Sequence, residues 1–320
     1  MRHTSISASR QQETCWRPSK RPSQRDAANA SMTNSPSCAR TAPDFPVPPG
    51  ATDCHCHVFG PYGRFPLEGE RTYTPPECTS SDYLRLLDSL RFSRGVLVQP
   101  SAHGLDNRAL LHALAAAPDR LRGVAVVDPR LGTPDLRTLA AQGVCGLRFS
   151  RLLSQGHARY KNAVDVRELH KVLPALRELG MHVQLWSDID VLVELEPLIR
   201  ASRVPFVLDH MGRVDPTRGI DDPRFSVLLA LHAEGLVWIK LTPYRVSAAY
   251  PDYEDIRLFH DRLLATNPER LVWGSDWPHV NMAHSVPDAG HLLNLLSAWT
   301  PNRKLLEKIL VHNPAALYRF

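Results

Sequence analysis

The sequence predicts an α/β protein whose main domain is a (β/α)8 barrel, or TIM barrel, preceded by a disordered N-terminal leader. Two observations predict this fold class. From residue 51 onward, eight short β-branched runs alternate with longer amphipathic segments. The span of about 270 residues also suits one barrel with modest insertions. Continuous apolar strands joined by crossovers are typical of a parallel sheet that is buried on both faces.

The expected strands are short apolar runs separated by helical patterns. The runs are 51–59, 94–100, 121–128, 144–150, 182–187, 205–212, 237–243 and 271–278. Intervening segments such as VRELHKVLPALRELG and DIDVLVELEPLIRA have apolar residues at i, i+3, i+4 and i+7, which predicts amphipathic helices. A doubly wound open sheet is the alternative. It would place a G-x-G-x-x-G turn after the first strand, and the sequence there is HVFGPYG.

Residues 1–49 are rich in Ser, Thr, Pro, Ala and Arg without a sustained apolar period, which predicts a leader before a barrel over residues 50–320. Met32 offers a second possible start, so residues 1–31 could be an over-extended gene model. Residues 1–31 hold six Lys or Arg and two acidic residues, which accounts for +4 of the formal charge of +5. Because the charge lies in the leader without interleaved aromatic residues, we expect no nucleic-acid partner.

Hydropathy and cysteine usage indicate a cytoplasmic enzyme. The mean hydropathy is -0.25, and no apolar run approaches the roughly 18 residues of a membrane span or forms a signal-peptide core. The six cysteines show no C-x-x-C spacing, so we expect reduced thiols. Cys54 and Cys56 alternate with His55 and His57, which predicts that the two thiols pack on the strand face opposite the histidines.

Polar residues gather at the carboxyl ends of the expected strands, where barrel enzymes have their active sites. They are Asp53, His55 and His57; Gln99 and Ser101; Arg148; Trp186; Asp209 and His210; Lys240 and Arg245; and Ser275, Asp276 and His279. Any one of them could be a structural residue with satisfied hydrogen bonds. Their occurrence at the same end of so many strands predicts a functional site.

The residue types leave two kinds of chemistry open. His55, His57 and Asp276 could hold one divalent metal, with zinc the best match, and His210 lies in the same group. Without a metal, Asp276 would take a proton from water while the histidines polarise a carbonyl group. The guanidinium groups of Arg148 and Arg245 suit a carboxylate or sulfonate, although each could form an ordinary ion pair. The expected partner is therefore a small anionic molecule.

Several motifs resemble the amidohydrolase superfamily, in its amidohydrolase-2 branch, over about residues 44–320. They are DCHCHVFGP, GVLVQPSAHGLDN, GLRF, DHMGR, WGSDWPHVNM and HNPAALY. The resemblance implies an amidohydrolase-type barrel in which His55, His57, His210 and Asp276 form the catalytic set. Asp276 would activate water and return the proton to the leaving oxygen. The substrate contacts expected at this site are Tyr73, Ser101, Arg148, Trp186, Arg245 and His279.

The expected function is a hydrolase that opens a carboxylated lactone, such as arises in aromatic-compound catabolism. The alternatives are a metal-dependent decarboxylase, a hydrolase of a sugar or sulfo-lactone, and a barrel that only binds an acidic metabolite. One departure from the family pattern bears on the substrate. A second basic residue is expected about six positions after Arg148, where this chain has Ser154, and Arg151 could replace it. The sequence assigns no oligomeric state.

Overall fold

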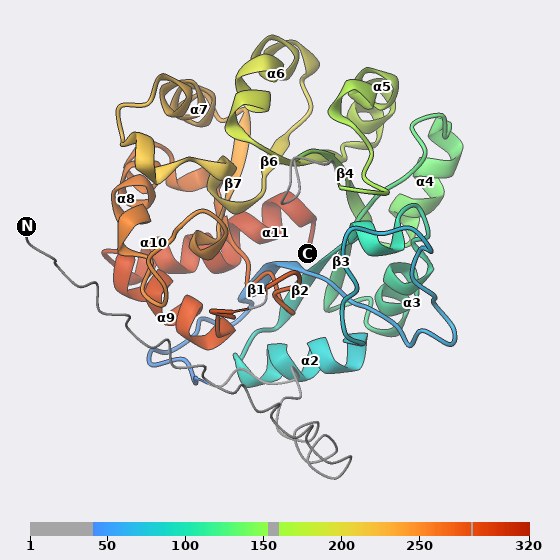
Figure 1. Cartoon of the computed structure of the whole chain (residues 1–320), viewed down its shortest axis with the longest axis horizontal. Coiled ribbons are helices and arrows are strands. Elements are labelled where there is room, and N and C mark those ends of the chain that lie inside the picture. The colour runs from blue at the N-terminus through green and yellow to red at the C-terminus, as the bar shows by residue number, and fades with distance from the viewer. Residues whose placement is uncertain (1–40, 153–159, 283) are drawn as a thin grey trace, which may run out of the picture. The chain divides into compact units, whose positions relative to one another are not determined.

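The computed structural model describes residues 41–152, 160–282 and 284–320, and in these ranges the chain forms a (β/α)8 barrel (Figure 1). Within the described residues, eight parallel strands pair in chain order. They are β1 (Thr52–Cys56), β2 (Arg94–Val98), β3 (Leu121–Ala125), β4 (Val144–Arg151), β5 (His182–Ser187), β6 (Phe206–Leu208), β7 (Val237–Leu241) and β8 (Leu271–Trp273). The predicted fold class is confirmed. The expectations for residues 1–40, including the start at Met32, lie outside the described ranges.

Most of the helices form a ring around the strands in Figure 1, while α11 crosses the middle of the view near the C-terminus. They are α2 (Ser80–Ser89), α3 (Arg108–Ala116), α4 (Thr133–Ala141), α5 (Leu169–Leu179), α6 (Ile189–Ser202), α7 (Pro223–Ala233), α8 (Arg257–Thr266), α9 (Ala289–Trp299), α10 (Arg303–Glu307) and α11 (Asn313–Tyr318). Helix α2 begins with a capping box between Thr79 and Asp82. A large apolar core lies between strands and helices, and each fully buried Leu or Phe in it contributes about 1.5–3 kcal/mol.

Six strands end before their predicted bounds, and β6 and β8 end earliest relative to them, by four and five residues. In these two cases the backbone turns at the polar residues that follow the strand. Strand β6 ends at Leu208 rather than at residue 212, since His210 and Met211 have φ values of 49° and 56°. Strand β8 ends at Trp273 rather than at residue 278, and Asp276 has φ 57°. Left-handed backbone cannot continue a strand ladder. The polar residues therefore lie on loops that fold over the carboxyl end of the barrel.

The first and last strands meet through irregular backbone contacts at this end. The amide of Asp276 donates to the carbonyl of His55 at 2.8 Å, and the amide of His57 donates to Trp277 O at 2.8 Å. Asp53 adds a side-chain link, since its Oδ2 accepts from the Ser275 hydroxyl at 2.6 Å. Gly274 allows the close approach, because a Cβ there would lie 2.5 Å from that of His55.

The prediction for the two cysteines of β1 is right about burial and wrong about their shared face. Both thiols are buried and free. Cys56 belongs to the large core, whereas Cys54 packs inside the barrel in a smaller apolar group, the interior cluster, that includes Trp238 and Tyr318. Strict alternation fails because the pairing register of β1 with β2 shifts between Asp53 and Cys56.

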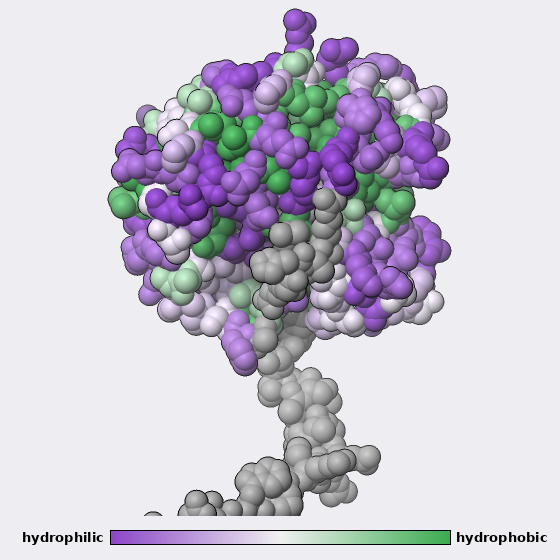
Figure 2. All heavy atoms as spheres, turned by 45° about the horizontal axis from the view of Figure 1, so that its top comes forward, coloured by the Kyte–Doolittle hydropathy of each residue, from purple (hydrophilic) through white to green (hydrophobic). Residues whose placement is uncertain are grey.

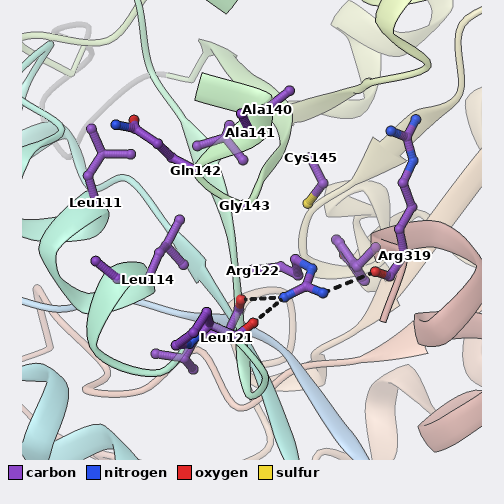
Figure 3. Close-up of a pocket in the computed structure, with 14 residues that line it drawn as sticks. Leu111, Leu114, Leu121, Arg122, Ala140, Ala141, Gln142, Gly143, Cys145 and Arg319 are labelled. Carbon is purple, nitrogen blue, oxygen red and sulfur yellow. Dashed lines mark hydrogen bonds between the residues drawn. The ribbon is translucent and has the colours of Figure 1, made fainter. Parts of the chain in front are cut away.

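The C-terminal residues close the amino end of the barrel. Tyr318 is fully buried in the interior cluster, and its ring contacts that of His182 with centroids 5.5 Å apart. A cavity of about 520 Å³ lies beside it, between α3, α4 and the start of β4 (Figure 3). Its lining is mixed, and the guanidinium of Arg122, one of its polar groups, already donates to the carbonyls of Leu121 and Arg319. We regard this cavity as a packing feature.

Among the described residues, no helix is both long and apolar enough to cross a membrane. The molecular face in Figure 2 is mostly hydrophilic, with smaller hydrophobic groups between the polar residues. This mixture is ordinary for a surface exposed to water.

The buried His182 should make stability depend on pH. Burial lowers the pKa of His182 to about 3, below its ordinary value of 6.5. The folded state therefore resists protonation, so this contribution to stability is full above about pH 6.5 and is lost as the pH falls. At pH 5 the loss is about 2 kcal/mol. We expect His182→Leu to reduce the difference in unfolding free energy between pH 7.5 and pH 5 by about this amount in denaturant titrations. An identical pH dependence in both proteins would contradict the assignment.

Candidate active site

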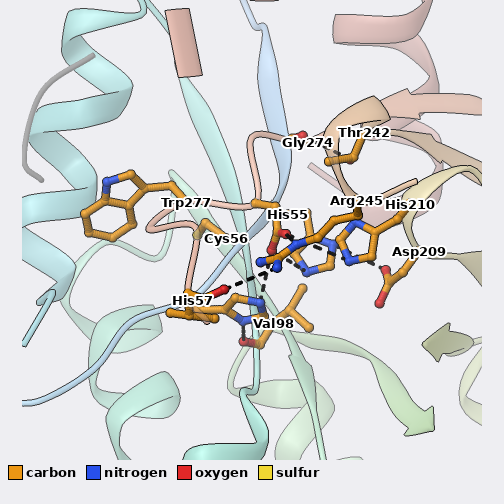
Figure 4. A network of polar contacts seen from close by, with 12 residues as sticks. His55, Cys56, His57, Val98, Asp209, His210, Thr242, Arg245, Gly274 and Trp277 are labelled. Carbon is orange, nitrogen blue, oxygen red and sulfur yellow. Dashed lines mark hydrogen bonds and ion pairs between the residues drawn. The ribbon is translucent and has the colours of Figure 1, made fainter. Parts of the chain in front are cut away.

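The polar residues at the strand ends converge on one buried network at the carboxyl end of the barrel (Figure 4). His55 and His57 come from the end of β1, Asp209 and His210 follow β6, and Asp276 follows β8. All five side chains are almost completely buried. The rings of His55 and His210 stack with centroids 5.0 Å apart, and His55 meets His57 edge to face at the same distance.

The two oxygens of the Asp276 carboxylate have different surroundings. Oδ2 accepts hydrogen bonds from the Tyr244 hydroxyl at 2.5 Å and from Arg245 Nε at 2.7 Å. Oδ1 lies 3.3 Å from His57 Nε2 and 3.6 Å from His55 Nε2. Burial alone would raise the pKa of Asp276, but the positive charge of Arg245 and the nearby histidines outweigh it and hold the pKa well below its usual value. The carboxylate is therefore ionised, with Oδ1 as its less occupied oxygen.

The tautomer of His57 follows from its hydrogen bond. Its Nδ1 lies 2.7 Å from the carbonyl oxygen of Val98, and because a carbonyl only accepts, Nδ1 carries a proton. Nε2 then faces Asp276 Oδ1 either as a lone pair or with a second proton. A lone pair beside a carboxylate oxygen requires a cation between them, so this part of the site suits a positive charge.

The site also has the donor atoms of a metal centre. One candidate ligand from each of His55, His57 and Asp276 lies within 4.8 Å of the other two. Two of these atoms, His55 Nε2 and Asp276 Oδ1, are buried without an aligned hydrogen-bond partner among the described residues. Imidazole nitrogen and carboxylate oxygen are common zinc ligands. The residues therefore fit one divalent metal, in agreement with the set expected from the sequence.

A second group of possible ligands, His55, Asp209 and His210, is less suitable. Asp209 Oδ2 accepts from Arg148 Nη2 at 2.9 Å and Nε at 3.2 Å, and also from Gln184. Lys240 Nζ lies 3.3 Å from Asp209 Oδ1. These positive charges hold the pKa of Asp209 well below its usual value despite burial. The carboxylate is thus already occupied by two cations.

A cavity of about 210 Å³ opens onto this network. Its lining residues are His57, Tyr73, Arg148, Leu152, Tyr160, Trp186, His210, Arg213, Arg245, Asp276, Val280 and Asn281. One wall is aromatic: the Trp186 ring lies 4.5 Å from the guanidinium carbon of Arg148 and 4.5 Å, centroid to centroid, from the Tyr160 ring. A small cavity with a few convergent polar groups suits a small ligand.

The structure places most of the predicted substrate contacts at this cavity, and three expected residues elsewhere. Ser101 contacts the Tyr73 hydroxyl and lines a smaller neighbouring cavity. The ring of His279 packs edge to face against that of Tyr244, with centroids 5.4 Å apart. Its Nε2 is 3.1 Å from the carbonyl oxygen of Ser275. Arg151 pairs with Glu194 and Asp165 and is not among the lining residues. Ser154 lies outside the described ranges.

The two predicted arginines are not free. Arg148 pairs with Asp209, and Arg245 pairs with Asp276 and donates from Nη1 to the carbonyl of Val280. The alternative of an ordinary ion pair is thus present in both cases. Both guanidinium groups nevertheless line the cavity.

Sequence reasoning missed several side chains of this site, including Tyr160 of the aromatic wall, and two of them bear directly on its charges. Tyr244 directly precedes Arg245 and bonds the same carboxylate oxygen, which neither a motif nor a period indicates. Arg213 reaches the cavity because residues 210–213 all have positive φ, between 49° and 66°, and this tight coil brings it back over the barrel. Gly212 was the available signal: a Cβ there would lie 2.4 Å from Leu228 Cδ1.

Fold and site together define a barrel enzyme with a histidine–aspartate centre beside an arginine-lined cavity. The family model described as Amidohydrolase matches residues 52–320, and the chain belongs to this family. It is 37% identical over 289 residues to a 2-pyrone-4,6-dicarboxylate hydrolase of Comamonas testosteroni, covering 86% of this chain and 92% of the relative. It is 38% identical over 284 residues to a 4-sulfomuconolactone hydrolase of Rhizobium radiobacter, covering 88% and 94%.

A solved structure gives the same result. The crystal structure of a probable 2-pyrone-4,6-dicarboxylic acid hydrolase from Acinetobacter baumannii, with citric acid bound, superposes with a TM-score of 0.74 at 30% identity. The match covers 85% of this chain and 100% of that chain. The family resemblance inferred from the motifs is therefore confirmed, and the curated relatives belong to the predicted enzyme class, hydrolases of cyclic esters.

The Tyr244 hydroxyl should help to keep Asp276 ionised. Removing a donor to a carboxylate disfavours its charged form, so we expect Tyr244→Phe to raise the pKa of Asp276. A hydrogen bond to a charged group is worth about 1.5–3 kcal/mol, so its loss should shift the equilibrium toward the protonated form. The carboxyl ¹³C chemical shift of Asp276, followed as a function of pH, measures this change. Tyr253→Phe is the matched control, because Tyr253 is also buried and the charged groups that act on it are those of Tyr250 and Asp252. An unchanged midpoint in Tyr244→Phe would exclude the role.

Proposed function

We propose that this protein hydrolyses a small lactone that carries a carboxylate group, with Asp276 as the general base. The observation that carries the proposal is the position of Asp276 Oδ1. This oxygen belongs to an ionised carboxylate and lies beside two imidazole rings, and Asp276 is one of the lining residues of a cavity that three arginines also line. A site of this kind can both activate water and bind an anionic substrate.

The arginines keep donor groups for a substrate although each has an acidic partner. Arg148 uses Nε and Nη2 on Asp209, Arg245 uses Nε and Nη1, and Arg213 donates from Nε to Asp188. A guanidinium has five N–H donors. The remaining donors can bind a carboxylate while the acidic partners reduce the cost of burying three like charges beside one another.

In the proposed reaction, Asp276 takes one proton from water and later gives it to the leaving oxygen. A water molecule beside Asp276 Oδ1 loses a proton to the carboxylate while its oxygen attacks the lactone carbonyl carbon. The histidines around the site stabilise the negative charge that develops on the carbonyl oxygen. When the tetrahedral intermediate collapses, the ring C–O bond breaks, and Asp276 returns its proton to the leaving oxygen. The product is a ring-opened acid.

A metal would be held by His55, His57 and Asp276, and would supply Lewis acidity to the carbonyl oxygen and to water. The contributions of this chain's own residues are the same with or without it. The arginines orient the anionic substituent, the aromatic wall supports the ring, and Asp276 holds the proton between attack and departure of the leaving oxygen.

The names of the relatives support an anionic lactone as substrate. The two relatives are hydrolases of a pyrone dicarboxylate and of a sulfonated muconolactone. A sulfonated lactone is the second candidate, because guanidinium groups bind a sulfonate as they do a carboxylate, and because the sulfomuconolactone hydrolase is as similar to this chain as the pyrone hydrolase is.

The role of Asp276 is tested with a lactone panel that includes 2-pyrone-4,6-dicarboxylate and a sulfonated lactone, assayed with and without a chelator. General-base catalysis contributes about 10²–10⁴-fold, so we expect Asp276→Asn to lower kcat by at least about 100-fold. Circular dichroism checks that the isosteric variant is folded. Lactone hydrolysis retained at the wild-type rate in the folded variant would contradict the mechanism.

Arg213 should bind the anionic substituent directly. A hydrogen bond to a charged group is worth about 1.5–3 kcal/mol, so we expect Arg213→Gln to raise KM for a carboxylated lactone by about 10–100-fold. A neutral lactone should show a much smaller effect.

Arg151→Gln provides the matched control for Arg213→Gln, because Arg151 pairs with Glu194 and Asp165 and does not line the cavity. Its KM should stay near the wild-type value. Equal effects of the two substitutions would show that the general positive charge, and not the placement of Arg213, determines binding.

A further inference from the structure

Lys240 is a fully buried lysine that lines no part of the active-site cavity. It lies on β7 with 0% of its surface exposed, and lysine is almost never buried to this extent unless it is paired. Its Nζ lies 2.8 Å from Gln184 Oε1, 3.3 Å from Asp209 Oδ1 and 3.4 Å from His55 Nδ1. Because the cavity lining does not include it, Lys240 can affect a substrate only through these neighbours.

The hydrogen-bond inventory of Lys240 fixes the direction of each contact. An ammonium group has three donors and no acceptor. Gln184 presents its oxygen to Lys240, since its amide nitrogen donates to Asp209 Oδ2 at 3.2 Å. Asp209 is the counter-charge of the ammonium group. The third neighbour, His55 Nδ1, can accept a hydrogen bond from Lys240 only through a lone pair.

Asp209 is the competitor for His55 Nδ1. Its Oδ1 lies 3.3 Å from that nitrogen and would accept a bond if Nδ1 carried a proton. However, Asp209 Oδ1 has no aligned donor among the described residues, whereas the contact between Lys240 and His55 has hydrogen-bond geometry. The geometry therefore favours Lys240 as the donor and His55 Nδ1 as the acceptor.

We propose that Lys240 is a positioning residue that places the imidazole proton of His55 on Nε2, so that His55 faces the active site as a hydrogen-bond donor and not as a metal ligand. The two histidines of the H-x-H motif then differ. His57 carries its proton on Nδ1, bonded to Val98, and presents Nε2 to Asp276. His55 presents an N–H group to Asp276 Oδ1, 3.6 Å away.

This tautomer of His55 disfavours metal binding. A metal on His55 Nε2 requires the proton to move to Nδ1, which breaks the hydrogen bond from Lys240. The ammonium group thus opposes metal binding at a site whose ligand spacing otherwise permits it. A role of this N–H donor in catalysis rests on the proposed lactone hydrolysis. The tautomer itself is inferred from the contacts of Lys240 and does not depend on that reaction.

The first test is ¹⁵N NMR of histidine-labelled wild-type protein, prepared without metal, with the His55 signals assigned by comparison with His55→Gln. The ring ¹⁵N shifts distinguish a protonated nitrogen from one with a lone pair. We expect Nε2 of His55 to be protonated and Nδ1 to be bare. A proton on Nδ1 would overturn the proposal. This measurement needs no variant of Lys240, so it stands even where Lys240→Met fails to fold.

The second test is the affinity for Zn²⁺, measured by competition with a chromogenic chelator. Outer-shell partners commonly change metal affinity by about 10–100-fold. We expect Lys240→Met to bind Zn²⁺ more tightly by about this factor, with the His55 proton shifted to Nδ1. Gln184→Met is the control, because Gln184 contacts Lys240 and Asp209 but is not bonded to His55. An unchanged affinity in folded Lys240→Met, or an equal gain in Gln184→Met, would overturn the proposal. Neither test uses a lactone, so failure here is separable from failure of the proposed reaction.

Discussion

The hydrogen bond between the Asp276 amide and the His55 carbonyl is the contact on which the site depends. It joins the chain after β8 to the end of β1 and so closes the barrel at its carboxyl end. Since the same two residues carry the carboxylate and one of the imidazoles, barrel closure also sets the distance between these groups. The lack of a side chain at Gly274 and the bond from Ser275 to Asp53 hold the backbones close enough for this geometry.

Charge compensation is the second constraint, and it couples the site to the barrel interior. Asp209 lies between Arg148 and Lys240, while Asp276 is held by Arg245. Removing one member of a buried ion pair typically costs about 3–5 kcal/mol, because the other charge is left without a partner. The arginines are therefore structural and ligand-facing at once. A substitution of one of these residues can therefore destabilise the fold as well as change the chemistry, so only variants of similar size and shape separate the two effects.

Much of the fold was predictable because both faces of each strand are buried, which makes strands visible as apolar runs. The convergence of Asp276 and His210 at the carboxyl end was also predictable, since barrel topology brings the strand ends together, although both residues lie beyond the strands that were expected to contain them. Partners were not. A sequence period places Arg148 and Arg245 at the correct end but does not show that Asp209 and Asp276 neutralise them. Likewise, the register shift that separates Cys54 from Cys56 depends on pairing with β2.

The closed amino end of the barrel has a consequence for turnover. Among the described residues, Tyr318 and the interior cluster fill that end, whereas the cavity is lined by residues at the carboxyl end. Substrate and product would then use the same opening. Lactone hydrolysis creates a new carboxylate, so the product carries one more negative charge than the substrate did. If the arginines bind the substrate as proposed, they would hold the product more strongly, and their acidic partners would favour its release by competing for the same guanidinium groups.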